Sequence, residues 1–501
     1  MSDSLFRLKT RLAQIIRLGQ AASVLSWDQQ TYMPTGGAAS RAEQLATLSQ
    51  FTHELFVSPE VGALLAQAEA DTQGEGKDSD AVRLLRNVRR SYNQETKLPV
   101  DLVMELARHS SLAQEIWQQA RKENNFAVFA PALEKMIALT REKAEHLGYK
   151  DHIYDALIDL YEPGTTQASV AAMFNDLKPE LVALTRAIAS SPNTVDDSLL
   201  HGDFPIEKQK EVTLQFVRAV GYSLERGRQD IAAHPFCTHF SRDDVRITTR
   251  FDARFLPMSV YASLHEAGHA MYEQGSPPEY EGTALAGGTS LGVHESQSRL
   301  WENLVGRSRE FCGWSYPQLQ AAFPDVLGRV GVDAYYRAIN KVEPSLIRVE
   351  ADEVTYNLHI LLRFELECDL LTGKLAVSDL PATWNAKMQE MLGITPPNDA
   401  DGVLQDVHWS CGLVGYFPTY SIGNLLSAQL WEALRKVLPD VNAQIARGEF
   451  APLLDWLRAN VHGYGSKYLP GELVVKATGE PLSSRPYLAY LKSKFAGIYG
   501  L

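Results

Sequence analysis

The sequence predicts a mostly α-helical protein built as one large body. Apolar residues recur at helical spacing through most of the 501 residues, whereas few stretches alternate like a strand, the clearest being residues 244–250. No stretch has the composition of a linker, and no internal repeat is evident. We therefore expect a single domain over residues 1–501, with one helical body or two lobes flanking a groove, and a small β-sheet near the active site.

Helical periodicity predicts six long helices outside the motif region discussed below. They cover residues 41–55, 129–147, 167–190, 206–220, 357–371 and 424–437. The most polar stretch of the chain, residues 68–80, contains Gly74 and Gly76 and predicts one exposed loop between two helices.

The most informative motif is His265-Glu266-Ala267-Gly268-His269. Residues four apart lie on the same face of a helix, so both imidazoles can bind one metal ion. Glu266 is turned by about 100° from His265 and can reach a water molecule on that ion. Two metal ligands and a base are typical of a zinc peptidase, whereas the plainer interpretation is two ordinary histidines on a helix.

The residues that flank this motif favour a helix. Pro257 and Ser259 suit its first turn, and Gly275 followed by Pro277 suits its end. A catalytic zinc site usually has three protein ligands, so a third must come from elsewhere. A metzincin would need Gly at position 272 and His at position 275, and the residues found there, Tyr272 and Gly275, exclude that class.

The third ligand is expected to be a carboxylate. The four cysteines have no paired spacing and lie at Cys237, Cys312, Cys368 and Cys411. Glu279 and Glu281 follow the motif in a proline loop, where the chain has little length to turn back. Glu295 lies on a helix predicted after the glycine turn at 286–288 and is our choice; Glu302, two turns further along, is the weaker candidate.

His294 is also able to bind a metal, but it is adjacent to Glu295. Neighbours on a helix face different directions, so only one of the two should be a ligand. We expect His294 to support the cleft or to contact substrate; the alternative is a hydrogen-bonded structural histidine.

Five stretches together carry a family resemblance. They are 24–34, Asp-x-Arg-x-Thr at 244–248, the motif at 265–269 with His-Glu-Ser-Gln at 294–297, Ile-Arg-x-x-Ala-Asp at 347–352 and Gly-x-x-Gln-Asp-x-His-Trp at 402–409. In this order they resemble the thermostable carboxypeptidase (M32) family of zinc metallocarboxypeptidases, from about residue 10 to the C-terminus. The resemblance implies a helical fold with a deep central groove, similar to angiotensin-converting enzyme and neurolysin. It also implies release of single residues from peptide C-termini, zinc that cobalt can replace, and a homodimer.

The candidate catalytic residues are Glu266, His408 and Tyr420. Glu266 would take a proton from the attacking water and deliver it to the leaving amine. His408 and Tyr420 would donate hydrogen bonds to the developing oxyanion, as the resemblance to the converting-enzyme clan supports. Tyr416 competes with Tyr420 for this role, and either tyrosine could instead be a core aromatic.

A carboxypeptidase must also bind the terminal carboxylate of its substrate. A guanidinium does this best, and Arg348 is the first choice because its motif belongs to the resemblance; Arg246 is the second, and it could instead pair with Asp244 or Asp243. The strand at 244–250 could add an extended peptide to the sheet. Asp352 and Asp406 are two further carboxylates that could support the ligand histidines, and the alternative is that they are ordinary solvated or capping groups.

Composition and charge disfavour several classes of partner. The formal net charge is −13 and no basic run occurs, which disfavours nucleic acid and anionic membrane surfaces. The first residues lack the apolar core of a signal peptide, no stretch of about 18 apolar residues occurs, and four scattered cysteines indicate reduced thiols, so we expect a cytoplasmic protein.

Two rival functions are a zinc oligoendopeptidase and a non-catalytic helical protein that binds metal or peptide.

Overall fold

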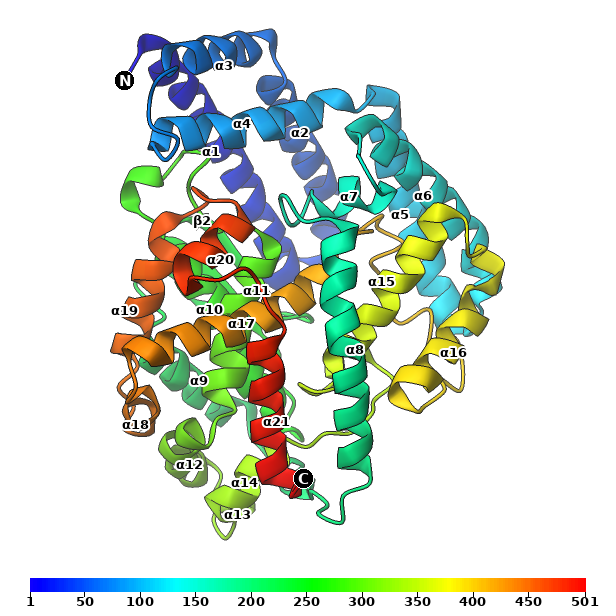
Figure 1. Cartoon of the computed structure of the whole chain (residues 1–501), viewed down its shortest axis with the longest axis vertical. Coiled ribbons are helices and arrows are strands. Elements are labelled where there is room, and N and C mark those ends of the chain that lie inside the picture. Colours follow the sequence, from blue (N-terminus) through cyan, green and yellow to red (C-terminus); the bar gives the residue numbers. More distant parts are fainter.

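The computed structural model describes residues 1–501, which fold into many helices and one three-stranded sheet that packs against α1 and α10 (Figure 1). The predicted mostly helical fold is confirmed. None of the helices combines the length and apolar composition that a bilayer crossing requires.

The N-terminal helices build most of a second, smaller hydrophobic cluster, which Tyr280 and Leu285 complete. These helices are α1 (Asp3–Thr31), α2 (Ala38–Phe56), α3 (Pro59–Asp71) and α4 (Asp80–Lys97). Leu8, Leu65 and Leu85 of three of these helices pack in a cluster of 13 buried residues, separate from the main core of 96. The 29-residue helix α1 runs on from this cluster towards the sheet, so it connects the small cluster with the region of the metal motif.

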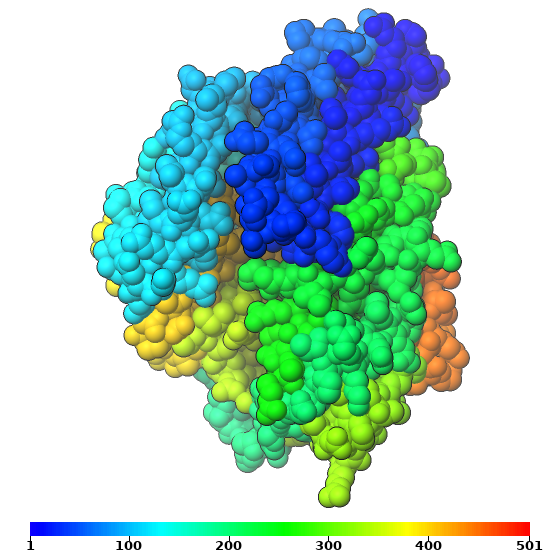
Figure 2. Space-filling model, turned by 180° about the vertical axis from the view of Figure 1, so that it is seen from behind, coloured from blue at the N-terminus to red at the C-terminus, as the bar shows by residue number.

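The main core extends over the rest of the chain. The helices before the sheet are α5 (Val100–Glu123), α6 (Phe126–Leu147), α7 (Ile153–Ile158), α8 (Gln167–Ala189) and α9 (Ile206–Val220). Those after it are α10 (Leu256–Gln274), α11 (Leu291–Arg299), α12 (Arg309–Ala322), α13 (Pro324–Leu327), α14 (Val332–Ile339), α15 (Tyr356–Thr372), α16 (Leu380–Leu392), α17 (Pro418–Val437), α18 (Val441–Ala446), α19 (Ala451–Asn460), α20 (Pro470–Thr478) and α21 (Arg485–Tyr499). In the view from behind, the surface is hollowed between the blue N-terminal helices and the cyan segment, and more C-terminal atoms are visible at the bottom (Figure 2).

The sheet has the order β1-β3-β2 and consists of β1 (Gln229–Ile231), β2 (Cys237–Ser241) and β3 (Asp244–Thr249). β3 pairs with β1 in parallel and with β2 in antiparallel orientation. Because β3 has a neighbour on both sides, it cannot add a peptide strand, and the expectation that residues 244–250 would do so is wrong. The edge of β2 that does not pair with β3 has no strand partner, and Cys237 and Thr238 of β2 line a cavity bounded by α1 and α2.

The predicted helices agree with the observed ones to within a few residues, with one exception. The helix predicted over 424–437 begins at Pro418, which occupies its first turn. Tyr420 therefore lies on the first turn of α17 instead of in a preceding loop. The polar stretch at 68–80 is a loop only between Asp71 and Asp80, because α3 continues through its first residues.

Candidate metal centre and active site

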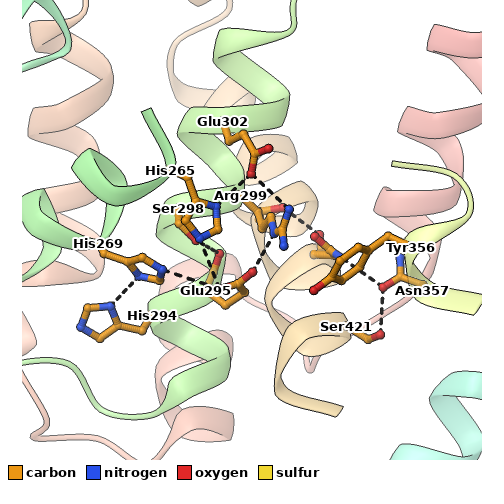
Figure 3. A network of polar contacts seen from close by, with 12 residues as sticks. His265, His269, His294, Glu295, Ser298, Arg299, Glu302, Tyr356, Asn357 and Ser421 are labelled. Atoms are coloured by element: carbon orange, nitrogen blue, oxygen red, sulfur yellow. Dashed lines mark hydrogen bonds and ion pairs between the residues drawn. The ribbon is translucent and has the colours of Figure 1, made fainter. Parts of the chain in front are cut away.

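The two histidines of the motif lie on one face of α10. Pro257 stands in the first turn of this helix, and Gly275 follows its last residue, as the sequence predicted. The rings of His265 and His269 are 4.9 Å apart, centroid to centroid. Their Nε2 atoms face Glu295 on the neighbouring helix α11 (Figure 3).

Glu295 completes a three-residue cluster. Its Oε2 lies 3.8 Å from Nε2 of His265 and 3.6 Å from Nε2 of His269, and the three ligand atoms lie within 4.8 Å of one another. Ligand atoms at about 2.0–2.1 Å from a tetrahedral zinc ion would be roughly 3.4 Å apart. The spacing and the two-nitrogen, one-oxygen donor set therefore fit a divalent metal such as zinc.

Two glycines allow α11 to lie close to both of its neighbours. A Cβ atom on Gly268 of α10 would lie 2.6 Å from the carbonyl oxygen of Gln297, and one on Gly423 of α17 would lie 2.5 Å from Cβ of Glu295. Any larger residue at either position would push the helices apart. The glycine inside the motif thus sets the distance between the two histidines and the third carboxylate.

Arg299 and Glu302 orient the cluster from behind. Arg299 donates from Nε to Oε1 of Glu295 at 2.7 Å, which leaves Oε2 facing the histidines. Oε2 of Glu302 lies 2.9 Å from Nδ1 of His265 and accepts a hydrogen bond from Nη1 of Arg299 at 3.1 Å (Figure 3). Although burial opposes ionisation, Arg299 and His265 hold the pKa of Glu302 well below its usual value.

The carboxyl group of Glu302 thus supports a ligand and is not part of the cluster itself. It lies on a π-helical segment, η4 (Leu300–Gly306), that continues α11 without a break. π-Helical turns are frequent at functional sites because they shift the side chains that follow.

Glu266 is buried beside the cluster. Burial raises its pKa to about 7, and the nearby charges of Glu295 and Glu302 act in the same direction, whereas His265 and Arg299 oppose it. A carboxyl group with a pKa near neutrality can both accept and return a proton. This is the behaviour that a general base in peptide hydrolysis requires.

His294 lies behind His269. The two Nδ1 atoms are 2.8 Å apart, and Nε2 of His294 lies 2.6 Å from Oε1 of Glu273 (Figure 3). Of the two roles expected from the sequence, support of the cleft and contact with substrate, this position favours support.

Arg348 is buried against Asp406, a carboxylate from the motif at 402–409. Its Nε and Nη2 both donate to Oδ1 of Asp406, at 3.1 and 2.8 Å, and its Nη1 donates to the hydroxyl of Tyr356 at 3.1 Å. Its guanidinium also lies 5.1 Å from the ring centre of Tyr420. Nη1 is therefore the one nitrogen of the guanidinium that does not donate to Asp406.

Asp406 and Asp352 support other parts of the site than the ligand histidines. Asp406 binds Arg348 and also Arg363, and these two cations hold its pKa far below the usual range although burial raises it. Asp352 accepts from the backbone N–H groups of Val354 and Thr355 and caps the entry to α15. Neither contacts a ligand histidine, so that possible role is wrong for both.

Arg246 lies on β3 and pairs with its own motif neighbour. Its Nε and Nη2 donate to the two carboxylate oxygens of Asp244, each at 2.8 Å, and its guanidinium stacks 4.3 Å from the ring centre of Trp27. The alternative of an internal ion pair with Asp244 is therefore confirmed. Nη1 of Arg246 does not contact Asp244, which binds only Nε and Nη2.

His408 and Tyr420 lie together, as predicted from separate motifs. Nε2 of His408 is 3.5 Å from the hydroxyl of Tyr420. Burial, with Arg348 and Arg363, lowers the pKa of His408 to about 4, so the ring is neutral at pH 7. Burial keeps the Tyr420 hydroxyl protonated by raising its pKa. Tyr416 packs against both rings, at 5.5 Å from each centroid, and remains the competitor.

Several residues that build the site were not singled out in the sequence. Arg299 holds Glu295, Glu273 binds His294, and Glu162 accepts from Ser290 Oγ and Gly292 N–H at the start of α11. For Arg299 a signal existed, because it lies four residues after Glu295 on one helix face. Glu162 had no local signal, since its partners are 128 and 130 residues away.

The chain matches a known metallopeptidase family over nearly its whole length. Residues 7–495 match the model of the family "Carboxypeptidase Taq (M32) metallopeptidase". "Thermostable carboxypeptidase 1" of Thermus thermophilus is 44% identical over 99% of both chains, and "Carboxypeptidase 1" of Bacillus subtilis is 38% identical over 97% of both. The crystal structure of the M32 carboxypeptidase from Deinococcus radiodurans is 39% identical over 100% of both chains, with a TM-score of 0.97. The resemblance drawn from the motifs is thereby confirmed over the whole chain.

Proposed function

Because the chain belongs to the carboxypeptidase Taq (M32) metallopeptidase family, we propose that it is a zinc-dependent carboxypeptidase that releases single amino acids from peptide C-termini. The observation that carries this proposal is the cluster of His265, His269 and Glu295 beside the buried Glu266. Cobalt is expected to replace zinc, since both accept this donor set in tetrahedral geometry.

The chemistry divides between the metal and the side chains around it. A zinc ion held by the three ligands would supply Lewis acidity that activates water and polarises the scissile carbonyl. Glu266 takes the proton of the attacking water and returns it to the leaving amine nitrogen. His408 and Tyr420 donate hydrogen bonds to the oxygen that becomes negative, because at pH 7 the neutral ring of His408 still carries one N–H group and the hydroxyl of Tyr420 keeps its proton.

Arg348 is the residue that we propose for the terminal carboxylate. Its guanidinium lies beside Tyr420, so a carboxylate bound there would lie next to the residues proposed for the oxyanion. Asp406 holds the guanidinium through Nε and Nη2, and Nη1 donates one of its two N–H groups to the hydroxyl of Tyr356, so that its second N–H group is the one we propose for a ligand. Arg246 remains the second candidate, although its stacking on Trp27 places it towards α1.

The exopeptidase and endopeptidase functions are separated by substrates without a free C-terminus. We expect a short peptide with an amidated C-terminus to be cleaved at least about tenfold more slowly, in kcat/KM, than the same peptide with a free carboxylate, since one charge-assisted contact contributes about 1.5–3 kcal/mol. The products are identified by mass spectrometry. Equal rates, or internal cleavage of the amidated peptide, would favour an oligoendopeptidase.

We also propose that the substrate backbone adds to the open edge of β2. The N–H groups of Val245 and Ile247 donate to the backbone carbonyl oxygens of Arg226 and Arg228, whereas the N–H group of Thr248 donates to the carbonyl oxygen of Phe236. The backbone groups of the even-numbered residues of β3 therefore point towards β2. By the antiparallel alternation, the peptide groups of Cys237 and His239 then point away from β3. Cys237 lines two adjoining cavities of about 510 and 580 Å³, bounded by α1.

A proline substitution tests this strand addition. Cys237→Pro removes one outward N–H group, whereas Cys237→Ala keeps it, and proline is tolerated at such an edge position. We expect kcat/KM to be about 2- to 10-fold lower for Cys237→Pro than for Cys237→Ala, the effect of one hydrogen bond. Equal values for the two variants, or a bound peptide analogue without main-chain bonds to β2, would contradict the proposal.

The domain organisation, the assembly and the location of the protein are also proposals. We propose one peptidase domain over residues 1–501, a homodimer, and a cytoplasmic location, with peptides as partners. All four cysteines are free thiols, which suits a reducing compartment. A native mass equal to one chain of 55.7 kDa in light scattering would rule out the dimer.

A further inference from the structure

A chain of hydrogen bonds leads away from the metal cluster behind His269. Nδ1 of His269 lies 2.8 Å from Nδ1 of His294, and Nε2 of His294 lies 2.6 Å from Oε1 of Glu273. Glu273 also accepts from the backbone N–H of Gly288 at 3.2 Å. In Figure 3, His294 lies on the opposite side of the His269 ring from Glu295.

The protons in this chain can be placed only one way if His269 binds a metal. When His269 is a metal ligand, the lone pair of its Nε2 binds the ion, so the proton of the ring must be on Nδ1. Nδ1 of His294 must then be unprotonated, because two N–H groups cannot face each other at 2.8 Å. The proton of His294 is therefore on Nε2, the atom that faces the carboxylate of Glu273.

Glu273 is suited to end this chain. The side chain is buried, and an ionised carboxylate is an acceptor only, so it accepts the hydrogen bond from Nε2–H of His294 and offers no donor in return. Although burial raises its pKa, the hydrogen bond from His294 and the charge of His239 lower it to about 2. The Gly288 turn lets the imidazole approach, because a Cβ there would lie 2.5 Å from Cδ2 of His294.

The two ligand histidines are supported in different ways. His265 contacts the carboxylate of Glu302 directly, at 2.9 Å. His269 contacts a second imidazole, and the carboxylate lies one residue further away. The interposed ring can hold His269 in the metal-binding tautomer only while its own tautomer is held by Glu273.

We infer that His294 is a positioning residue of the metal centre, whose Nδ1 lone pair fixes the tautomer and the ring orientation of His269, and that Glu273 fixes the tautomer of His294. This inference rests on the proposed role of His269 as a metal ligand. It assigns His294 to the metal centre in place of the substrate contact considered from the sequence.

The test is the zinc affinity of the full-length protein, measured by competition with a chromogenic chelator. His294→Phe keeps the size of the ring and its packing on Tyr272, but it removes the acceptor. We expect it to weaken zinc binding by about 10- to 100-fold, the usual cost of losing such a partner. His294→Asn offers Oδ1 close to the position of Nδ1 and should restore most of the affinity.

The matched control is His109→Phe. His109 is buried on α5 and its Nε2 contacts the carbonyl oxygen of Ala132 at 2.7 Å, so this variant also loses one buried histidine hydrogen bond. We expect His109→Phe to lower the melting temperature of the metal-free protein without changing zinc affinity. The comparison separates loss of stability from loss of metal positioning.

A second pair of variants covers the case in which His294→Phe does not fold. Glu273→Gln keeps an acceptor for Nε2 of His294, whereas Glu273→Met does not, and only Glu273→Met should weaken zinc binding by a similar factor. Unchanged affinity in His294→Phe, or equal losses for Phe and Asn, would overturn the inference. If the unaltered protein binds no zinc, the proposed function fails instead.

Discussion

Replacing Glu266 by Gln is expected to lower kcat by about 10²- to 10⁴-fold while the protein keeps its metal. Gln has nearly the same shape as Glu but cannot take the proton of the attacking water. Because Glu266 is buried beside the cluster and is not one of the three ligands, the metal site should stay intact. Release of amino acids from a short peptide gives kcat, and elemental analysis of the same sample gives the metal content.

The control for this substitution is Glu279→Gln. Glu279 is an exposed carboxylate a few residues beyond the end of α10, so the same chemical change occurs near the motif without touching the site. We expect its kcat to equal that of the unaltered protein. Turnover at the normal rate by metal-loaded Glu266→Gln would refute the role of Glu266 and would leave the metal without a base.

Removal of the metal by a chelator is expected to abolish activity and to lower the melting temperature. Without the ion, nothing activates the attacking water, and Glu295 and the two histidines lose their common partner in a buried site. A ligand present at about 1,000 times its dissociation constant stabilises the folded state by about 4 kcal/mol. Calorimetry of the protein with and without metal measures this difference.

Activity should return when zinc or cobalt is added to the metal-free protein, and magnesium should not restore it, since this ion prefers six oxygen ligands. Glu281→Gln is a suitable control, because Glu281 was a candidate ligand in the sequence but lies outside the cluster. Full activity after exhaustive chelation would contradict a metal-dependent mechanism. Loss of metal binding in Glu281→Gln would contradict the ligand set proposed for the site.

Much of the metal centre could be predicted because it depends on local geometry. The spacing of His265 and His269 on one helix places both rings on one side, whatever surrounds the helix. Glu295 could be chosen because it is the next carboxylate on a helix with enough chain before it to turn back. Both predictions depend on short-range geometry, namely the period of the helix and the length of chain between two neighbouring helices.

The rest of the site depends on which helices pack together. The contact between Arg348 and Asp406 joins residues 58 apart, and their motifs do not indicate that they pair. Glu302 was weighed as a ligand, but the π-helical turn places it behind His265. The strand at β3 was predicted correctly, yet only the sheet order shows that its edges are occupied.

By itself, then, the sequence determined the helical class, the motif helix and the three candidate ligands, because these follow from the period of the helix and from short-range chain length. The tertiary structure decided how those ligands are held: His294 and Glu273 behind His269, Glu302 behind His265, and Arg299 on Glu295. These contacts depend on the distance between α10, α11 and α17, which Gly268 and Gly423 permit. Such distances result from the packing of whole helices, which no local spacing records.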